Sequence, residues 1–83
     1  MSQSYQMPRA ALFAELWEVQ SGQCALCGSV MLRSRYDAPH ARVWAKYRAT
    51  LDHILPRSKG GSDMRANLQL AHARCNKIKG NRV

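Results

Sequence analysis

The first third of the chain carries apolar residues at helical spacing. The positions that would share one face of a helix are Leu12, Phe13, Leu16 and Trp17. Pro8 lies where a helix can begin, and Ser21 and Gly22 lie where this helix would end. We therefore predict a helix from Pro8 to about Gln20 that packs on the core, and we assign it no chemistry.

The last third predicts a strand, a loop, a second strand and a helix, in that order. The apolar runs at 51–55 and 68–70 are expected to be strands, and the segment 56–62 is rich in proline, glycine and serine. A helix is expected from Ala73 onward, ending at Gly80. Together with the first helix, this order predicts a small α+β fold.

Chain length constrains stability. With 83 residues there is room for one domain, predicted to span 1–83, and so short a chain needs a staple beyond its apolar core. Three cysteines, an odd number, favour a reduced compartment in which thiolates bind metal over a disulfide framework. We expect a cytoplasmic protein. The stretch 1–16 is interrupted by Arg9 and Glu15, so no secretory signal is predicted, and no run is long enough to span a bilayer.

Charge indicates the class of partner. Thirteen Lys and Arg stand against five Asp and Glu, which gives a formal net charge of +8. Beyond Asp63 the sequence has no acidic residue. Its basic residues there are Arg65, Arg74, Lys77, Lys79 and Arg82. This imbalance favours nucleic acid over a membrane surface, because the basic residues form no amphipathic stripe beside an apolar face.

Two pairs of candidate metal ligands have the same two-residue gap. Cys24 and Cys27 form a tight knuckle, and His72 and Cys75 repeat its spacing. Four ligands of this type favour Zn²⁺, and a site filled entirely by protein is structural rather than catalytic. The alternatives are a redox pair at Cys24 and Cys27 and a nucleophilic Cys75. No βαβ pattern accompanies the former, and His72 beside the latter is equally well explained as a ligand.

The segment 30–50 gives the weakest structural signal, with a turn expected at 37–39. It interleaves the basic residues Arg33, Arg35, Arg42, Lys46 and Arg48 with the aromatic residues Tyr36, Trp44 and Tyr47. The aromatic rings either stack on exposed bases, or pack against the knuckle while the arginines alone face nucleic acid, and we expect the second arrangement. His40 is interpreted as a loop histidine and not as a ligand.

Five motifs follow one another over about residues 23–80. They are Cys24-x-x-Cys27-Gly28, Asp52-His53-Ile54-x-Pro56, Lys59-Gly60-Gly61-Ser62, Asn67-Leu68-x-Leu70 and His72-x-x-Cys75-Asn76-x-x-Lys79. In this combination the sequence resembles the zinc-containing branch of the HNH endonuclease family. The resemblance implies a ββα-metal (His-Me finger) fold with a structural zinc knuckle pair, preceded here by the N-terminal helix.

The resemblance also implies roles for single residues. His53 would be the general base that activates water, and Asn67 would use its side-chain amide to hold the loop that orients this base. Asp52 and Asn76 would bind one catalytic Mg²⁺ or Mn²⁺, or another divalent transition metal. The implied reaction is hydrolysis of a DNA phosphodiester, by nicking or double-strand cleavage, which leaves 5′-phosphate and 3′-hydroxyl ends.

The sequence departs from the family pattern at two positions. Asn76 stands where the last His of the triplet is usual, and His72 stands where the second knuckle usually begins with Cys. His72 would therefore be able to serve the catalytic metal and leave zinc with three cysteines, but the knuckle spacing favours the zinc assignment. The neighbours Asp52 and His53 would point to opposite faces of a regular strand, so we expect the strand to end or twist there.

Basic residues near the motifs are candidates for phosphate contacts. They are Arg57, Lys59, Arg74, Lys77 and Lys79. Nothing resembles a base-reading helix module, so we expect double-stranded DNA to be bound with low sequence specificity and strong salt dependence. Two alternatives stay open: a zinc-stabilised DNA-binding module, and a nuclease subunit of a larger phage, mobile-element or restriction assembly in which a partner protein supplies specificity.

Overall fold

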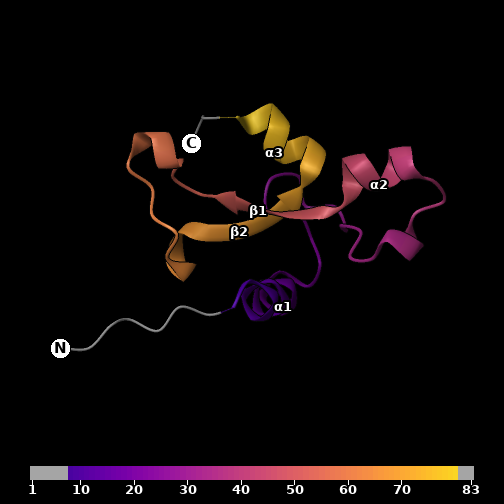
Figure 1. Cartoon of the computed structure of the whole chain (residues 1–83), viewed down its shortest axis with the longest axis horizontal. Coiled ribbons are helices and arrows are strands. Elements are labelled where there is room, and N and C mark those ends of the chain that lie inside the picture. The colour runs from indigo at the N-terminus through magenta and orange to yellow at the C-terminus, as the bar shows by residue number, and fades with distance from the viewer. Residues whose placement is uncertain (1–7, 81–83) are drawn as a thin grey trace.

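The computed structural model describes residues 8–80, and residues 1–7 and 81–83 lie outside the described part. Predictions that concern those residues, namely the outer limits of the 1–83 domain, the start of the stretch 1–16 and the basic Arg82, fall outside it as well. Figure 1 traces a first helix, an excursion that contains a short second helix, two strands and a last helix. None of the helices in the described part is long and apolar enough to cross a membrane.

Helix α1 (Arg9–Gln20) confirms the helix predicted from the apolar pattern. It begins directly after Pro8 and ends at Ser21, whose backbone is left-handed with φ of 54°. The Ser21 N–H bonds back to the Glu18 carbonyl at 3.2 Å, which closes the last turn. Leu12 and Leu16 are buried, so the helix uses its apolar face for packing, as expected.

Strands β1 (Ala49–His53) and β2 (Leu68–His72) form one antiparallel sheet with five residue pairs. Ala49 lies opposite His72 at one end, and His53 lies opposite Leu68 at the other. The first strand was predicted two residues too late, at 51–55. It starts earlier because the Ala49 N–H bonds to the Leu32 carbonyl at 2.9 Å, and residues 68–72 extend β2 beyond the predicted 68–70.

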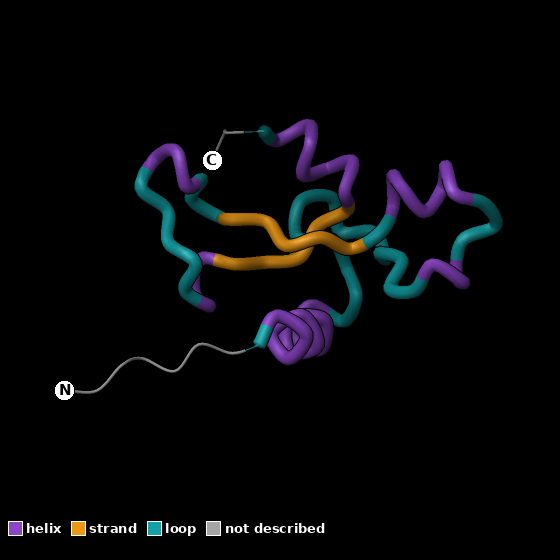
Figure 2. The backbone as a smooth tube through the Cα atoms, viewed as in Figure 1, coloured by secondary structure: helices purple, strands orange, loops and turns teal. Residues whose placement is uncertain are grey.

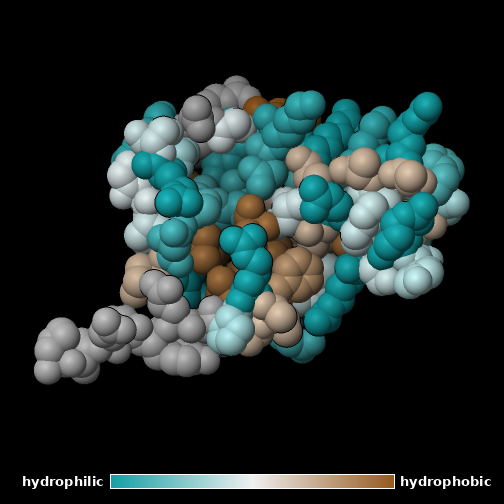
Figure 3. Space-filling view, viewed as in Figure 1, coloured by the Kyte–Doolittle hydropathy of each residue, from teal (hydrophilic) through white to brown (hydrophobic). Residues whose placement is uncertain are grey.

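The core lies between the sheet and the helices. Helix α1 covers one side of the sheet, and α3 (Ala73–Lys79) crosses the other side and ends before Gly80, as predicted (Figure 1). The buried apolar residues are Leu12, Leu16, Cys24, Met31, Leu68, Leu70 and Ala71. In Figure 3, apolar atoms show between the sheet and α1, while hydrophilic side chains cover most of the remaining face. A core this small agrees with the expectation that the fold needs a staple.

The segment 30–48 contains a helix that sequence reasoning missed. Helix α2 (Ala41–Tyr47) packs beside α3. The sequence did not predict this helix because its few apolar positions do not form a recognisable stripe. The Arg33 guanidinium lies 5.2 Å from the ring centroid of Trp17 on α1, so this arginine packs on the protein. The ring of Tyr47 packs edge-on against the imidazole of His72, with 5.7 Å between the ring centroids, whereas Tyr36 is 95% exposed. The expected packing of aromatics against the knuckle therefore holds for Tyr47 and not for Tyr36.

Candidate functional site

The sheet carries a polar side-chain cluster at each of its two ends. His72, the last residue of β2, belongs to a cluster with the cysteines, and His53, the last residue of β1, lines a hollow at the opposite end. Figure 2 shows the two strands side by side between these ends. A five-residue strand is about 13 Å long from first to last Cα, so one rigid ladder sets the separation of the two clusters.

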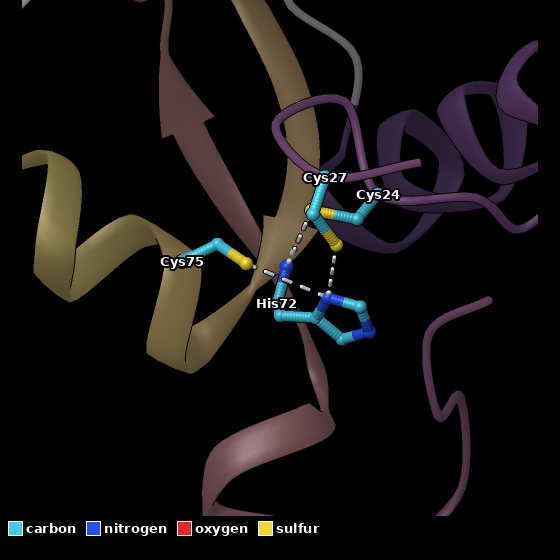
Figure 4. Close-up of side chains that lie close together, drawn as sticks. All are labelled: Cys24, Cys27, His72 and Cys75. Carbon is cyan, nitrogen blue, oxygen red and sulfur yellow. Dashed lines mark hydrogen bonds between the residues drawn. The ribbon is translucent and has the colours of Figure 1, made fainter. Parts of the chain in front are cut away.

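Four side chains converge at the first end of the sheet (Figure 4). Cys24 and Cys27 come from the loop after α1, His72 from the end of β2, and Cys75 from the first turn of α3. Their ligand atoms all lie within 4.8 Å of one another. His72 Nδ1 is 3.3 Å from the Cys27 sulfur and 3.7 Å from the Cys75 sulfur. The two ligand pairs predicted from their spacing are thus brought together.

This cluster fits a tetrahedral metal. Zn–S bonds of about 2.3 Å place neighbouring ligand atoms of a tetrahedron roughly 3.8 Å apart, close to the separations around His72. Three sulfurs and one imidazole favour zinc, and four protein ligands leave no position for a substrate. The cluster is therefore a candidate structural zinc site, not a reaction centre.

Backbone groups favour thiolates at two of the cysteines. Burial raises the pKa of Cys24, but the N–H groups of His72 and Leu26, each 3.4 Å from its sulfur, outweigh burial and lower that pKa. A backbone hydrogen bond also lowers the pKa of Cys27. Burial raises the pKa of Cys75 to about 11, so its thiolate depends on the charge of a bound cation.

The second nitrogen of His72 explains why this residue faces the cysteines. Its Nε2 lies 3.0 Å from the Val30 carbonyl, which can only accept, so Nε2 carries the hydrogen and Nδ1 is left as a ligand atom. The alternative in which His72 serves a catalytic metal would require the ring to point to the other end of β2. The structure places it with the cysteines.

At the second end, a polar hollow of about 260 Å³ lies between α3 and the loop 54–67. In Figure 3 the surface between this loop and α3 is recessed and hydrophilic. Three residues that the sequence assigned to chemistry, Asp52, His53 and Asn76, line it together with Arg57 and Ser58. Asp52 and His53, which are neighbours in the chain, can share one hollow because β1 ends at His53. This confirms the expected end of the strand there.

Asp52 is 4% exposed and its charge is balanced from within the protein. The Lys79 ammonium lies 2.9 and 3.1 Å from the two carboxylate oxygens, and the Gln69 amide donates to the same carboxylate at 2.7 Å. Lys79 also donates to the His53 carbonyl at 2.6 Å, and its side chain is only 10% exposed. Lys79, predicted as a phosphate contact, is thus placed inward against the end of β1.

Asn67 joins the two ends of the loop that follows His53. Its side-chain oxygen accepts from the Leu55 N–H at 2.8 Å, and its amide donates to the Leu55 and Ser62 carbonyls at 3.1 and 2.7 Å. The loop crosses itself so closely that a Cβ on Gly61 would lie 1.7 Å from the Leu55 oxygen. Residue 61 must therefore be glycine for this crossing, which explains one of the two adjacent glycines in the motif.

Asp63 is a site residue that sequence reasoning missed. Its carboxylate lies 2.7 Å from His53 Nε2 and 3.9 Å from the Arg57 guanidinium. The hydrogen bond from His53, followed by the charge of Arg57, holds the pKa of Asp63 below its ordinary value. One signal was available, since Asp63 is one of only five acidic residues and lies between the glycine pair and Asn67.

Neighbouring residues on α3 serve different ends of the sheet. Cys75 points to the cysteine cluster, and Asn76 lines the hollow. The Asn76 amide nitrogen lies 3.1 Å from the Leu51 carbonyl and 3.4 Å from the Thr50 hydroxyl, which leaves the amide oxygen as its possible cation ligand.

The four remaining predicted phosphate contacts are exposed. They are Arg57, Lys59, Arg74 and Lys77.

Comparison with protein families gives a match. The family model described as HNH endonuclease matches residues 24–82, well over half of the chain and a range that includes both clusters. A search of curated proteins found no match. The family match indicates a nuclease, and HNH nucleases act on DNA.

Proposed function

The chain belongs to the HNH endonuclease family, and we propose that it is a metal-dependent DNA endonuclease in which His53 is the general base. The observation that carries this proposal is the shared hollow, which Asp52, His53 and Asn76 line together. A water molecule takes up about 30 Å³ in liquid water. The hollow, at about 260 Å³, therefore has room for a phosphodiester group and a water molecule.

His53 has the position and the chemistry for proton transfer. Its side chain is 27% exposed, so one part of the ring is held by the protein while water still reaches the hollow. A neutral imidazole accepts a proton from water near neutral pH, which few other side chains do. In the proposed step the imidazole takes this proton, the water oxygen attacks phosphorus, and the bond to the 3′-oxygen breaks. The leaving 3′-oxygen takes a proton from solvent water, and the imidazolium returns its proton to solvent. The products are 5′-phosphate and 3′-hydroxyl ends.

Asp52 and Asn76 are the proposed ligands of a catalytic Mg²⁺ or Mn²⁺. A carboxylate and an amide oxygen are the hard donors that these ions prefer, and two protein ligands leave positions for phosphate and water. When bound, the ion supplies positive charge against the charge that develops on the phosphate and the leaving oxygen. Lys79 and Gln69 contact the same Asp52 carboxylate, so a bound ion would share this carboxylate with them.

The exposed basic residues would place the duplex over this hollow. Arg57 lines the hollow itself, and Arg74 and Lys77 lie on exposed positions of α3. Contacts of this type bind phosphates and not bases, so we propose low sequence specificity and an affinity that falls steeply with salt. A partner protein would then be the source of any sequence preference.

Plasmid cleavage tests the proposal most directly. Zinc-loaded wild-type protein, His53→Ala and His40→Ala are compared with and without added Mg²⁺ or Mn²⁺, and nicked and linear products are separated on a gel. His40 is a matched control, because it is an exposed histidine at the start of α2 whose side chain makes no cap hydrogen bond. We expect His53→Ala to lose at least about a hundredfold in rate and His40→Ala to keep wild-type activity.

Two results would contradict the proposal. Cleavage at the wild-type rate by a folded, zinc-containing His53→Ala protein would remove His53 from the mechanism. Tight DNA binding by the wild type with no cleavage under any divalent metal would instead favour a zinc-stabilised DNA-binding module.

A further inference from the structure

We propose that Asp63 is a positioning residue for His53. The Asp63 carboxylate accepts a hydrogen bond from His53 Nε2, and this makes His53 Nδ1 the atom that takes the proton from water. The inference rests on the proposed function of His53 as the base. It adds a carboxylate that lies outside the residues assigned from the motifs.

The hydrogen bond fixes which nitrogen of the ring is the base. The Asp63 carboxylate oxygen lies 2.7 Å from His53 Nε2. An ionised carboxylate can only accept hydrogen bonds, so Nε2 must carry the hydrogen. A neutral imidazole has one such hydrogen, which leaves the Nδ1 lone pair free. The same bond stops the ring from rotating, as a carboxylate does for a histidine in other proton-transfer sites.

The loop holds Asp63 beside His53 by contacts on both sides of the pair. Asn67 binds the carbonyl of Ser62, the residue before Asp63, at 2.7 Å, and it accepts from the N–H of Leu55, two residues after His53, at 2.8 Å. The Gly61 N–H also bonds to the Pro56 carbonyl at 2.9 Å. The segments that carry the two partners are therefore fastened to each other, and the contact does not depend on the exposed side chains alone.

The charge of Asp63 needs an explanation at this place. A carboxylate beside a hollow that binds phosphate would repel the substrate, and the chain has only five acidic residues against thirteen basic ones. Both carboxylate oxygens are used within the protein, one by His53 and the other by Arg57 at 3.9 Å. These two neighbours also lower the pKa of Asp63, so the group remains an acceptor over the working pH range. Orientation of the base is the function that accounts for a negative charge here.

The kinetic test compares Asp63→Asn and Asp63→Glu with the wild type in steady-state cleavage of a DNA duplex. Asp63→Asn is expected to lower kcat about tenfold or more. An amide can accept a hydrogen bond from Nε2 or donate one to it, so it permits both tautomers of the ring. KM is expected to stay equal or fall, since one repulsive charge is removed. Asp63→Glu should recover part of kcat. Asp37→Asn is the matched control, because it removes the same charge from an aspartate on the short turn Arg35–Asp37, away from His53.

A spectroscopic measurement tests the hydrogen bond without any activity. Histidine ¹⁵N shifts of the zinc-loaded protein, recorded at about pH 8.5 where ordinary histidines are neutral, report the tautomer of each ring. Only three histidines contribute, which makes assignment by substitution simple. We expect His53 of the wild type to carry its hydrogen on Nε2, and Asp63→Asn to give a mixture of tautomers.

The outcomes separate this inference from the proposed function. Wild-type cleavage by His53→Ala would overturn both. An inactive His53→Ala protein together with full kcat in Asp63→Asn would overturn the role of Asp63 alone. A wild-type His53 that carries its hydrogen on Nδ1 would also overturn it, whatever the rates.

Discussion

The two ends of the sheet differ in chemistry, although residues that are neighbours in the chain contribute to both. One end carries a closed cluster of metal ligands, and the other carries an open polar hollow. At the end near His72, four soft ligands lie within 4.8 Å of one another and enclose a site with no place for a substrate. At the end near His53, hard oxygen and nitrogen groups line a hollow of about 260 Å³ that solvent enters. The first end is suited to hold the chain together, and the second is suited to bind and react.

The comparison shows how a small fold separates stability from chemistry. Cys75 and Asn76 are adjacent on α3 and point to different ends, so the helix that completes the metal cluster also delivers a residue to the hollow. Five backbone pairs connect the two ends. Damage at the cysteine cluster should therefore abolish both stability and activity, whereas damage at the hollow should abolish activity and spare the fold.

Removal of the metal from the cysteine cluster should have the largest effect. Zinc binding in small domains contributes on the order of 10 kcal/mol, which exceeds the stability that a core of this size supplies. We expect a strong zinc chelator to abolish the far-UV circular dichroism of the folded protein and added Zn²⁺ to restore it. Added Mg²⁺ should not restore it, and a folded protein without zinc would show that the cluster is not a structural metal site.

Substitutions at the neighbours Cys75 and Asn76 should separate the two ends most cleanly. Cys75→Ala removes a zinc ligand, so we expect loss of bound zinc and of cooperative unfolding. Asn76→Ala should keep one zinc per chain and the wild-type unfolding midpoint within a few degrees, but lose at least about a hundredfold in cleavage rate. Zinc content and plasmid cleavage measure the two effects. Equal loss of zinc in both variants would contradict the division of α3 between the ends.

The buried ion pair at the end of β1 should rank next. Lys79→Met would leave the Asp52 carboxylate, 4% exposed, without its ammonium partner, and breaking such a pair costs about 3 kcal/mol. Lys77→Met is the matched control because Lys77 is an exposed lysine on the same helix. Urea unfolding should show the loss only for Lys79→Met, and DNA binding should weaken mainly for Lys77→Met. The reverse pattern would return Lys79 to the phosphate contacts.

Sequence reasoning predicted the helix α1, the order of strands and last helix, and the convergence of the four metal ligands. These features follow from local signals, because apolar spacing, Gly80 and the paired two-residue gaps act within a few residues. The missed features depend on distant contacts. The early start of β1 needs Leu32, and the inward course of Lys79 needs the buried Asp52. The contact of Asp63 with His53 needs a loop that returns on itself, which no periodicity encodes.

The two adjacent glycines of that loop should give the smallest but most local effect. Gly60 has φ of 89° and open space around it, so Gly60→Ala costs only backbone strain of about 1 kcal/mol. Gly61→Ala would bring a Cβ to 1.7 Å from the Leu55 carbonyl, which the Asn67 contacts hold in place, and should cost roughly 2 kcal/mol. Because the clash lies between His53 and Asp63, we expect Gly61→Ala to lose cleavage rate much more than Gly60→Ala while both keep their zinc. Equal rates in the two variants would mean that the close crossing of the loop does not position the base.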